Sequence, residues 1–278
     1  MSPKRAGLGP VRRFSEIDST NRYLADEARR GAAHGLVAVA GYQTAGRGRL
    51  GRSWEAPPGA NLLASVLLYP NEWPSDQPND EPATAHACTI AVALAAADSC
   101  RELAGVDPGL KWPNDLVVDD LKLAGVLAEA VSGTPNGLAV VVGIGLNVGW
   151  PDPTSASGDS PQAATSLAVL SDIPVELDVL LTSLLGNLDR RLSTLLDPTS
   201  RRSRHVARSE QTDEYRQRCV TLGRRVRVEE ANGTFTGVGV DLTDEGHLIV
   251  ETGGAGPTRR TVMAGDVVHL RHQDGPGT

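Results

Sequence analysis

Cysteine, lysine and long apolar runs are scarce in this 278-residue sequence. Its three cysteines, Cys88, Cys100 and Cys219, lie far apart without a C-x-x-C pair, which argues against a disulfide framework or a zinc site and favours reduced, packed thiols. No apolar run approaches the roughly 20 residues that span a bilayer, so we expect no membrane partner. The basic N-terminus, MSPKRAGLGPVRR, precedes no apolar stretch, which excludes a secretory signal and predicts a cytoplasmic location.

Positive charge is also in deficit, because the net charge is -7 and the isoelectric point is near 5.4. That balance argues against a protein that coats nucleic acid. Nearly all the basic residues are arginines, and the only lysines are Lys4, Lys111 and Lys122. Two of these three lie close together in the chain, which makes that segment a candidate site.

The length suggests one large domain followed by a small one. In the first half, local patterns predict alternating helices and strands. The expected elements are a helix capped by Asp18, Ser19 or Thr20 and ended by Gly31, buried strands over 35–43 and 60–70, a Pro-rich surface loop over 71–82, and an Ala-rich buried helix over 83–105.

The middle of the chain predicts a meander of hairpins, then a loop, then two helices. Short apolar runs over 115–120, 121–132 and 138–150 are separated by turn sequences at Asp119-Asp120 and at 134–137. A loop over 151–162 follows, and helices are expected over 175–197 and 199–217.

After Cys219 the pattern changes to short alternating strands separated by Asn232-Gly233, Glu245-Gly246 and Gly253-Gly254. Such spacing is typical of a small β-barrel. We therefore expect a first domain over 1–218, a second over 219–272, and a frayed tail over 273–278.

The stretch AGRGRLGRSWEAPPG (45–59) has glycines at the G-x-G-x-x-G spacing of a dinucleotide-binding turn. A Rossmann turn runs directly into a helix, whereas here Pro57-Pro58 and Gly59 prevent a continuous helix and no βαβ unit follows. A kinase loop is excluded too, since no V-A-I-K, H-R-D or D-F-G follows.

What distinguishes this loop is its arginines, at 47, 49 and 52, interleaved with glycines. Glycines let the backbone approach a ligand, and guanidinium groups bind phosphate and carboxylate. The loop therefore indicates an anion site, although a merely solvated basic loop is the alternative.

Two further segments point the same way. In LKWPNDLVVDDLKLAG (110–125), Lys122 sits inside an apolar strand, where a compact ammonium would fit and a guanidinium would not; a water-facing lysine is the alternative. In VVVGIGLNV (140–148), glycines would thin the wall beside a flat ligand and Asn147 could bind a base or phosphate edge, although a bulged core strand fits equally.

Together, the segments resemble the biotin protein ligase family (biotin–[acetyl-CoA-carboxylase] ligase). The resemblance rests on DSTN (18–21), GRGRLGR (46–52), KWPNDL (111–116), KLAG (122–125) and GIGLNV (143–148), in this order. It covers about 14–218 and extends into the terminal β-module. It implies an α+β fold, with a mixed sheet whose helices pack mainly on one face, followed by an SH3-like β-barrel.

The resemblance also implies the reaction. Biotin attacks the α-phosphate of ATP to give biotinyl-5′-AMP and pyrophosphate, and a lysine of a biotin carboxyl carrier protein then takes the biotinyl group. Mg²⁺ would be held mainly by the phosphates of ATP, with Asp115 as a candidate protein ligand. No covalent enzyme intermediate is needed, so the lack of a nucleophile paired with a base is no obstacle.

Site residues are carried over from the family position by position. For biotin they are Ser19, Thr20, Asn21, Gln43, Gly46, Arg47, Arg49, Lys122 and Gly125. For the nucleotide they are Arg47, Arg49, Arg52, Trp54, Lys111, Asn114, Asp115 and Asn147. Lys122 and Arg49 are the expected catalytic residues, and Leu123, Ala124, Gly125 and Ile144 would form apolar walls.

Some family members begin with a DNA-binding winged helix, but here the catalytic pattern starts near residue 14. We therefore expect a monofunctional ligase that does not bind DNA, and we interpret the Arg-rich run over 201–210 as a solvated helix face. The alternatives are a lipoate–protein ligase, which competition between the two acids would separate, and a non-catalytic biotin sensor, which would release no pyrophosphate. Monomer and homodimer both remain open.

Overall fold

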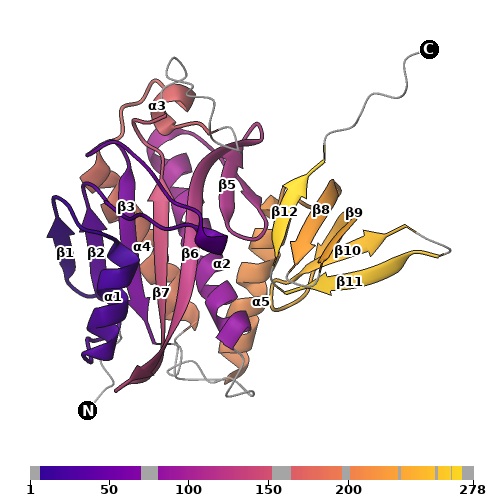
Figure 1. Cartoon of the computed structure of the whole chain (residues 1–278), viewed down its shortest axis with the longest axis horizontal. Helices are drawn as coiled ribbons and strands as arrows, with labels where there is room; N and C mark the ends of the chain where they lie inside the picture. Colours follow the sequence, from indigo (N-terminus) through magenta and orange to yellow (C-terminus); the bar gives the residue numbers. More distant parts are fainter. Residues whose placement is uncertain are drawn as a thin grey trace.

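The computed structural model describes residues 7–69, 81–151, 164–195, 201–230, 233–253, 256–263 and 265–270. The loops predicted over 71–82 and 151–162 fall almost entirely outside these residues, as does the tail. The described residues form two sheets, one in each of the two domains that the sequence predicts (Figure 1).

The first sheet has seven strands in the order β1-β2-β3-β7-β6-β5-β4. Only β1 and β2 are parallel, and every other neighbouring pair is antiparallel, so the sheet is mixed as expected. Its strands are β1 (Val11–Phe14), β2 (Val37–Ala40), β3 (Leu62–Leu68), β4 (Gly109–Lys111), β5 (Asp115–Val118), β6 (Leu121–Thr134) and β7 (Gly137–Leu146). The short edge strands β1 and β4 were not predicted from the sequence.

The two faces of this sheet have different coverings. One face packs against α2 (Glu81–Ala104) and α4 (Leu177–Leu195) in the main hydrophobic core. The other is covered in part by α1 (Thr20–Arg29), where Leu24 and Ala28 meet Val141 of β7 (Figure 1). Helices therefore lie mainly on one face, as expected, and α1 leaves the rest of the other face free for a site.

Local chemistry explains the elements that frame this free face. Ser19 caps α1 by accepting from the backbone N–H of Arg22, and Gly31 takes a positive φ of 85° just beyond the helix. Asp119 and Asp120 have φ of 50° and 64°, which makes the predicted two-residue turn between β5 and β6. The β6–β7 hairpin closes at Thr134 and Gly137, also as predicted.

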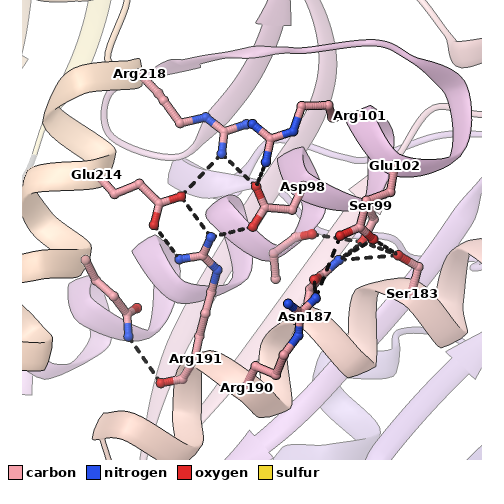
Figure 2. Close-up of polar contacts among 12 residues, drawn as sticks. Asp98, Ser99, Arg101, Glu102, Ser183, Asn187, Arg190, Arg191, Glu214 and Arg218 are labelled. Carbon is pink, nitrogen blue, oxygen red and sulfur yellow. Dashed lines mark hydrogen bonds and ion pairs between the residues drawn. The ribbon is translucent and has the colours of Figure 1, made fainter.

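A polar cluster joins the helices behind the sheet (Figure 2). Asp98 of α2 pairs with Arg191 of α4 and, at 2.9 Å, with Arg218 of α5 (Arg201–Arg218). Arg191 also pairs with Glu214 of α5 at 2.8 Å. Burial acts to raise the pKa of Asp98, but hydrogen bonds from Arg191 and Arg218 outweigh it and hold that pKa below its usual value. The cluster ties α5 to α2 and α4 just before the chain enters the second domain.

The second domain is a five-stranded antiparallel sheet in the order β11-β10-β9-β8-β12. Its strands are β8 (Arg225–Glu230), β9 (Gly233–Leu242), β10 (Leu248–Thr252), β11 (Thr258–Val262) and β12 (Asp266–His269). Strand β11 was missed because TRRTV has no alternating apolar pattern. Among the described residues, β11 and β12 are the two edges of the sheet, without the ladder between them that would close the expected barrel. The α+β architecture is confirmed.

The two domains meet through Trp112, which is buried. Its backbone N–H donates to Thr221 Oγ1 at 3.0 Å, and its indole N–H donates to the carbonyl of Gly246 at 3.0 Å. His86 Nε2 lies 2.8 Å from the same carbonyl, and burial lowers the pKa of His86 to about 4. The second domain is thus docked by directional contacts to the first.

All three cysteines are free and buried, as predicted, and burial raises the pKa of the Cys88 and Cys100 thiols to about 12. In the part of the chain that the structure describes, no helix is both long enough and apolar enough to cross a membrane.

Candidate active site

A cluster of uncharged polar side chains lies at the start of α1, facing β3. Gln43 Oε1 accepts from the backbone N–H of Thr20 at 2.7 Å and lies 3.0 Å from its hydroxyl. Ser65 Oγ lies 2.7 Å from Thr20 Oγ1 and 2.6 Å from Asn21 Oδ1. We call Thr20, Asn21, Gln43 and Ser65 the hydroxyl–amide cluster. Three of the predicted biotin residues are therefore in direct contact, and Ser19 beside them is occupied as the helix cap.

Glycine makes the room that this cluster needs. Gly143 of β7 lies against Asn21, and a Cβ at that position would come within 2.2 Å of Asn21 Oδ1. Any side chain there would displace the amide. The first glycine of the GIGLNV stretch thus serves the cluster, rather than a flat ligand as expected from the sequence.

The glycine- and arginine-rich loop folds back on itself without forming a helix. Trp54 donates its backbone N–H to the carbonyl of Gly46 at 3.0 Å. Beside them, the backbones of Arg47 and Ser53 pair in an isolated antiparallel β-bridge. A Cβ on Gly46 would meet the Trp54 carbonyl oxygen at 2.2 Å, so this close approach requires glycine. A single 3₁₀ turn, Arg49–Gly51, is the only helical piece in the loop. The next element after the loop is strand β3, so no βαβ unit follows it, as the sequence predicts.

Each loop arginine has a different protein partner. Arg47 pairs with Glu129 of β6 at 2.9 Å. Arg49 donates to Asn114 Oδ1 at 3.2 Å and to the carbonyl of Gly265 at 2.8 Å, and Arg52 pairs with Asp266 at 3.2 Å. Burial lowers the pKa of Arg49, but a guanidinium stays charged at any physiological pH. The second domain therefore holds two of the three loop arginines.

Trp54 lies flat against the sheet where two strands carry glycine. A Cβ on Gly145 would come within 2.3 Å of the indole, and one on Gly125 would come within 3.2 Å. The Lys122 ammonium lies 5.4 Å from the centre of the ring, within cation–π range. The glycines that were expected to make room for a ligand thus make room for Trp54 here.

Lys122 and Asp115 form an ion pair on neighbouring strands, with 2.7 Å between Nζ and Oδ1. Lys111 is near enough for both charges to act on it, and burial lowers its pKa. The strand lysine of the sequence argument therefore faces a carboxylate and an aromatic ring, not bulk water. The Lys122 ammonium therefore contacts both the Trp54 indole and the Asp115 carboxylate.

Two predicted residues are fully engaged in the scaffold. Asn147 is buried, accepts from Asn61 Nδ2 at 3.0 Å and donates to the carbonyl of Thr165 at 2.9 Å. Asn114 donates to the carbonyl of Val126 at 2.7 Å while its oxygen accepts from Arg49. Both orient backbone around the site, and their roles toward a nucleotide stay predictions.

The expected apolar walls were partly wrong. Leu123, Ala124 and Ile144 are buried in the core on the helix-covered side, so they cannot line the site. Ile144 alternates with Gly143 and Gly145 along β7, and a register shift between β5 and β6 lies beside Leu123 and Ala124. The motif alone resolved neither. Gly125 is the one predicted wall residue on the site side, where it adjoins Trp54.

A cavity of about 410 Å³ opens beside the loop, lined by Gln43, Gly46, Trp54 and Trp150 among others. Gln43 is the member of the hydroxyl–amide cluster that lines it, on the same cavity as Trp54. Within the described residues, no group of three or more His, Cys, Asp or Glu side chains is arranged to hold a metal ion.

Three residues of the site were missed by the sequence analysis: Ser65, Glu129 and Asp266. Ser65 is the one hydroxyl in the apolar strand LLASVLL, and Glu129 is a lone acid in β6. The argument that singled out Lys122, a polar residue inside an apolar strand, would have found both. Asp266 carries no such local signal, because only the docking of the two domains brings it to Arg52.

Comparison with known proteins supports the resemblance independently. The sequence matches the Biotin/lipoate A/B protein ligase family over residues 14–147 and the Biotin protein ligase C terminal domain over residues 221–270. It is 37% identical over 264 residues to the biotin–[acetyl-CoA-carboxylase] ligase of Mycobacterium tuberculosis, covering 92% of this chain and 88% of that protein. The chain belongs to the biotin protein ligases.

Further biotin protein ligases extend the similarity across nine-tenths or more of this chain. The biotin–[acetyl-CoA-carboxylase] ligase of Paracoccus denitrificans is 31% identical over 257 residues, covering 90% of this chain and 96% of that protein. The fold matches the solved biotin protein ligase from Aquifex aeolicus in complex with biotin and ATP, with a TM-score of 0.75 at 24% identity over 95% of this chain and 100% of that one. Both domains of this chain are therefore part of the family's architecture.

Proposed function

We propose that this chain activates biotin with ATP and transfers it to a lysine of a biotin carboxyl carrier protein. The observation that carries the proposal is that Lys122 and the arginine loop meet on one face of β6 and β7, with the hydroxyl–amide cluster alongside. Lys122 adjoins Trp54, and Trp54 is bonded to Gly46 of the loop. Separate polar and cationic parts within one site suit a substrate with a polar ring at one end and a carboxylate at the other.

In this proposal the hydroxyl–amide cluster and Ser19 bind the ureido ring of biotin, and Gly46 and Gly125 give its chain close access to the backbone. Arg47, Arg49 and Lys122 then receive the biotin carboxylate and the α-phosphate. Arg52, Trp54, Lys111, Asn114, Asp115 and Asn147 form the nucleotide side. Trp54 moves with the loop when the nucleotide enters.

The first step joins two anions. A carboxylate oxygen of biotin bonds to the α-phosphorus of ATP as the bond to pyrophosphate breaks. Positive charge from Arg47, Arg49 and Lys122 offsets the repulsion and stabilises the transition state, where charge on the phosphoryl oxygens is greatest. In the second step the carrier lysine nitrogen attacks the biotinyl carbonyl carbon, and AMP leaves with the electron pair of the broken bond.

Mg²⁺ fits the same site through one carboxylate. Magnesium bound to nucleotides is commonly held by the substrate phosphates with one or two protein carboxylates. Asp115 would supply that carboxylate, since it already bonds a cation, the Lys122 ammonium. When bound, the ion would neutralise part of the phosphate charge. Lys122 and the arginines would neutralise the rest and position the reacting groups.

The chain, on this proposal, acts in the cytoplasm and does not bind DNA. A lipoate ligase is the second candidate, because the matched family includes lipoate ligases. The match of the second domain to a biotin protein ligase domain favours biotin.

Biotin-dependent release of pyrophosphate from ATP tests the proposal. We expect Lys122→Ala to lower the rate by a factor corresponding to about 3 kcal/mol, because a positioned charge is lost. Its melting temperature should stay near that of the wild type. Arg13→Ala, which removes an exposed pair with Asp178, is the control and should react normally. Near-normal turnover in Lys122→Ala, or release driven by lipoate but not biotin, would contradict the proposal.

A further inference from the structure

Glu129 of β6 connects two parts of the site that the family resemblance treated separately. Its Oε2 accepts from Asn21 Nδ2 at 2.8 Å, and its Oε1 lies 2.9 Å from Nη2 of Arg47. The side chain is 26% exposed, so this carboxylate is mostly shielded from water. One residue thus touches both the hydroxyl–amide cluster and the arginine loop.

The contact with Asn21 decides which way the amide faces. Asn21 Nδ2 donates to the carbonyl of Leu127 at 3.2 Å and to Glu129, two groups that can only accept. The Asn21 oxygen must then point at Ser65, 2.6 Å away. Because that oxygen cannot donate, the Ser65 hydroxyl has to give its single proton to it.

This fixed proton has a consequence for the rest of the cluster. Ser65 Oγ has no proton left for Thr20, so it can only accept on that side. Thr20 has one hydroxyl proton and two neighbouring acceptors, Ser65 Oγ at 2.7 Å and Gln43 Oε1 at 3.0 Å. The Thr20 hydroxyl proton can serve only one of these two oxygens, and Gln43 Oε1 also accepts from the Thr20 backbone N–H at 2.7 Å. The oxygen that the hydroxyl does not serve keeps a lone pair that a ligand N–H can use.

We propose that Glu129 is a positioning residue that sets the hydrogen-bond polarity of the hydroxyl–amide cluster for the ureido ring and holds Arg47 beside it. The inference rests on the proposed function, since it assigns the ureido ring to this cluster. It extends that function by naming a residue that contacts neither reacting group but decides which ring the site accepts.

Glu129→Gln tests the idea with almost no change in shape. A carboxylate offers two acceptor oxygens, whereas an amide offers one oxygen and one NH₂ group. If the glutamine oxygen faces Asn21, its NH₂ opposes the Arg47 guanidinium; if it faces Arg47, its NH₂ opposes the NH₂ of Asn21. One of the two contacts is lost in either case.

Three acids separate a positioning role from a merely structural one. Biotin and desthiobiotin both carry the ureido ring, whereas tetrahydrothiophene-2-pentanoate keeps the sulfur ring and chain without it. Affinities are measured by calorimetry, alongside KM values for biotin and ATP from pyrophosphate release. We expect Glu129→Gln to weaken both ureido acids about tenfold, the scale of one charged hydrogen bond. The ureido-free acid and the KM for ATP should change less than twofold.

Equal weakening of all three acids would overturn the proposal, because general loosening of the site would act on each of them. An unchanged biotin affinity with a lower kcat would overturn it as well. Glu251→Gln is the matched control, since it makes the same chemical change in a pair with Arg259 on the second domain and should alter nothing. Glu129→Asp repeats the comparison if Glu129→Gln melts below the assay temperature. Failure of the wild type to release pyrophosphate with biotin would instead refute the proposed function.

Discussion

Arginine is used in two different ways in this protein. Behind the sheet, Arg191 and Arg218 are 14% and 15% exposed and share the carboxylates of Asp98 and Glu214. In the loop, Arg47 and Arg52 are 53% and 50% exposed, and each has a single carboxylate partner. The chemistry of the pairs is the same, and only their surroundings differ.

The difference shows how burial decides what an ion pair does. A shielded pair cannot lose a partner without leaving a charge unpaired in a poorly polar setting, so it is strongly structural. A half-exposed pair exchanges its partner for water or for a ligand at little cost. The helix cluster therefore fixes the scaffold, while the loop pairs keep guanidinium groups available for an anion.

The largest effect should come from breaking the shielded cluster. Asp98→Asn removes the charge that Arg191 and Arg218 share, and we expect the free energy of unfolding to fall by about 4 kcal/mol. Urea denaturation measures it, and pyrophosphate release at low temperature should remain normal because the site is on the other face. A loss below about 1 kcal/mol would show that the cluster behaves like a surface pair.

The next largest effect should come from lowering the pH, which should weaken the domain junction and leave the helix cluster intact. The pKa of both His86 and His269, at the domain junction, is lowered from 6.5 to about 4, mainly by burial. Between these values the unfolded chain binds protons that the folded one does not, so stability is full above pH 6.5 and is lost as the pH falls toward 4. We expect about 3 kcal/mol for His86 over this window and a smaller loss for His269, whose charge solvent partly screens.

The helix cluster should survive that window, because the pKa of Asp98 lies below its usual value and its carboxylate stays charged. Urea titrations at several pH values, compared between the wild type and His86→Gln, measure the effect. If the free energy of unfolding depends on pH in the same way in both proteins, His86 does not cause the acid destabilisation.

Arg49→Gly should affect retention of the adenylate more than its synthesis. Its contacts with Asn114 and Gly265 are replaceable by phosphate, and fork-like contacts slow release. We expect about tenfold faster escape of biotinyl-AMP, equivalent to about 1.4 kcal/mol. Biotin labelling of an unrelated lysine-rich protein, at equal ATP consumption, reports it. Labelling no higher than in the wild type would exclude Arg49 as the clamp.

The smallest effect should come from Asp266→Asn, the exposed counterpart of Asp98→Asn. Its pair with Arg52 is half-exposed, so we expect less than about 1 kcal/mol in stability. Releasing Arg52 should lower the KM for ATP about twofold, since the arginine no longer has to leave a carboxylate. A large destabilisation would mean that the two arginine regions are not different in kind.

Much of the site was visible in the sequence because its motifs are local. Gly46, Lys122 and Asn21 stand in short segments whose residue types already state their chemistry, and the structure brings those segments together. What local patterns did not give was the face of each strand: Leu123 and Ile144 were assigned to the site but belong to the core. A buried strand is apolar on both sides, so its pattern does not tell one face from the other.

The contacts between distant parts of the chain were also out of reach. Nothing near Asp266 or Gly265 marks them as partners of the loop, because the contact depends on how the second domain docks. The same holds for the contact of Trp54 with Gly145, and the assignment of Trp54 to the nucleotide stays a prediction. These partners lie far apart in the sequence, so no local motif describes the contacts between them.

The Arg49–Gly265 bond has a consequence for the order in which the protein is made. Every residue assigned to the site through Asn147 emerges from the ribosome long before Gly265, which lies 216 positions after Arg49. Domains fold as the chain is synthesised, with the N-terminal part first. During that interval the nascent chain can form the Arg47–Glu129 and Arg49–Asn114 contacts, whereas Gly265 and Asp266, the second-domain partners of Arg49 and Arg52, are still missing. The second domain therefore completes the contacts of the loop only after the whole first domain has been synthesised.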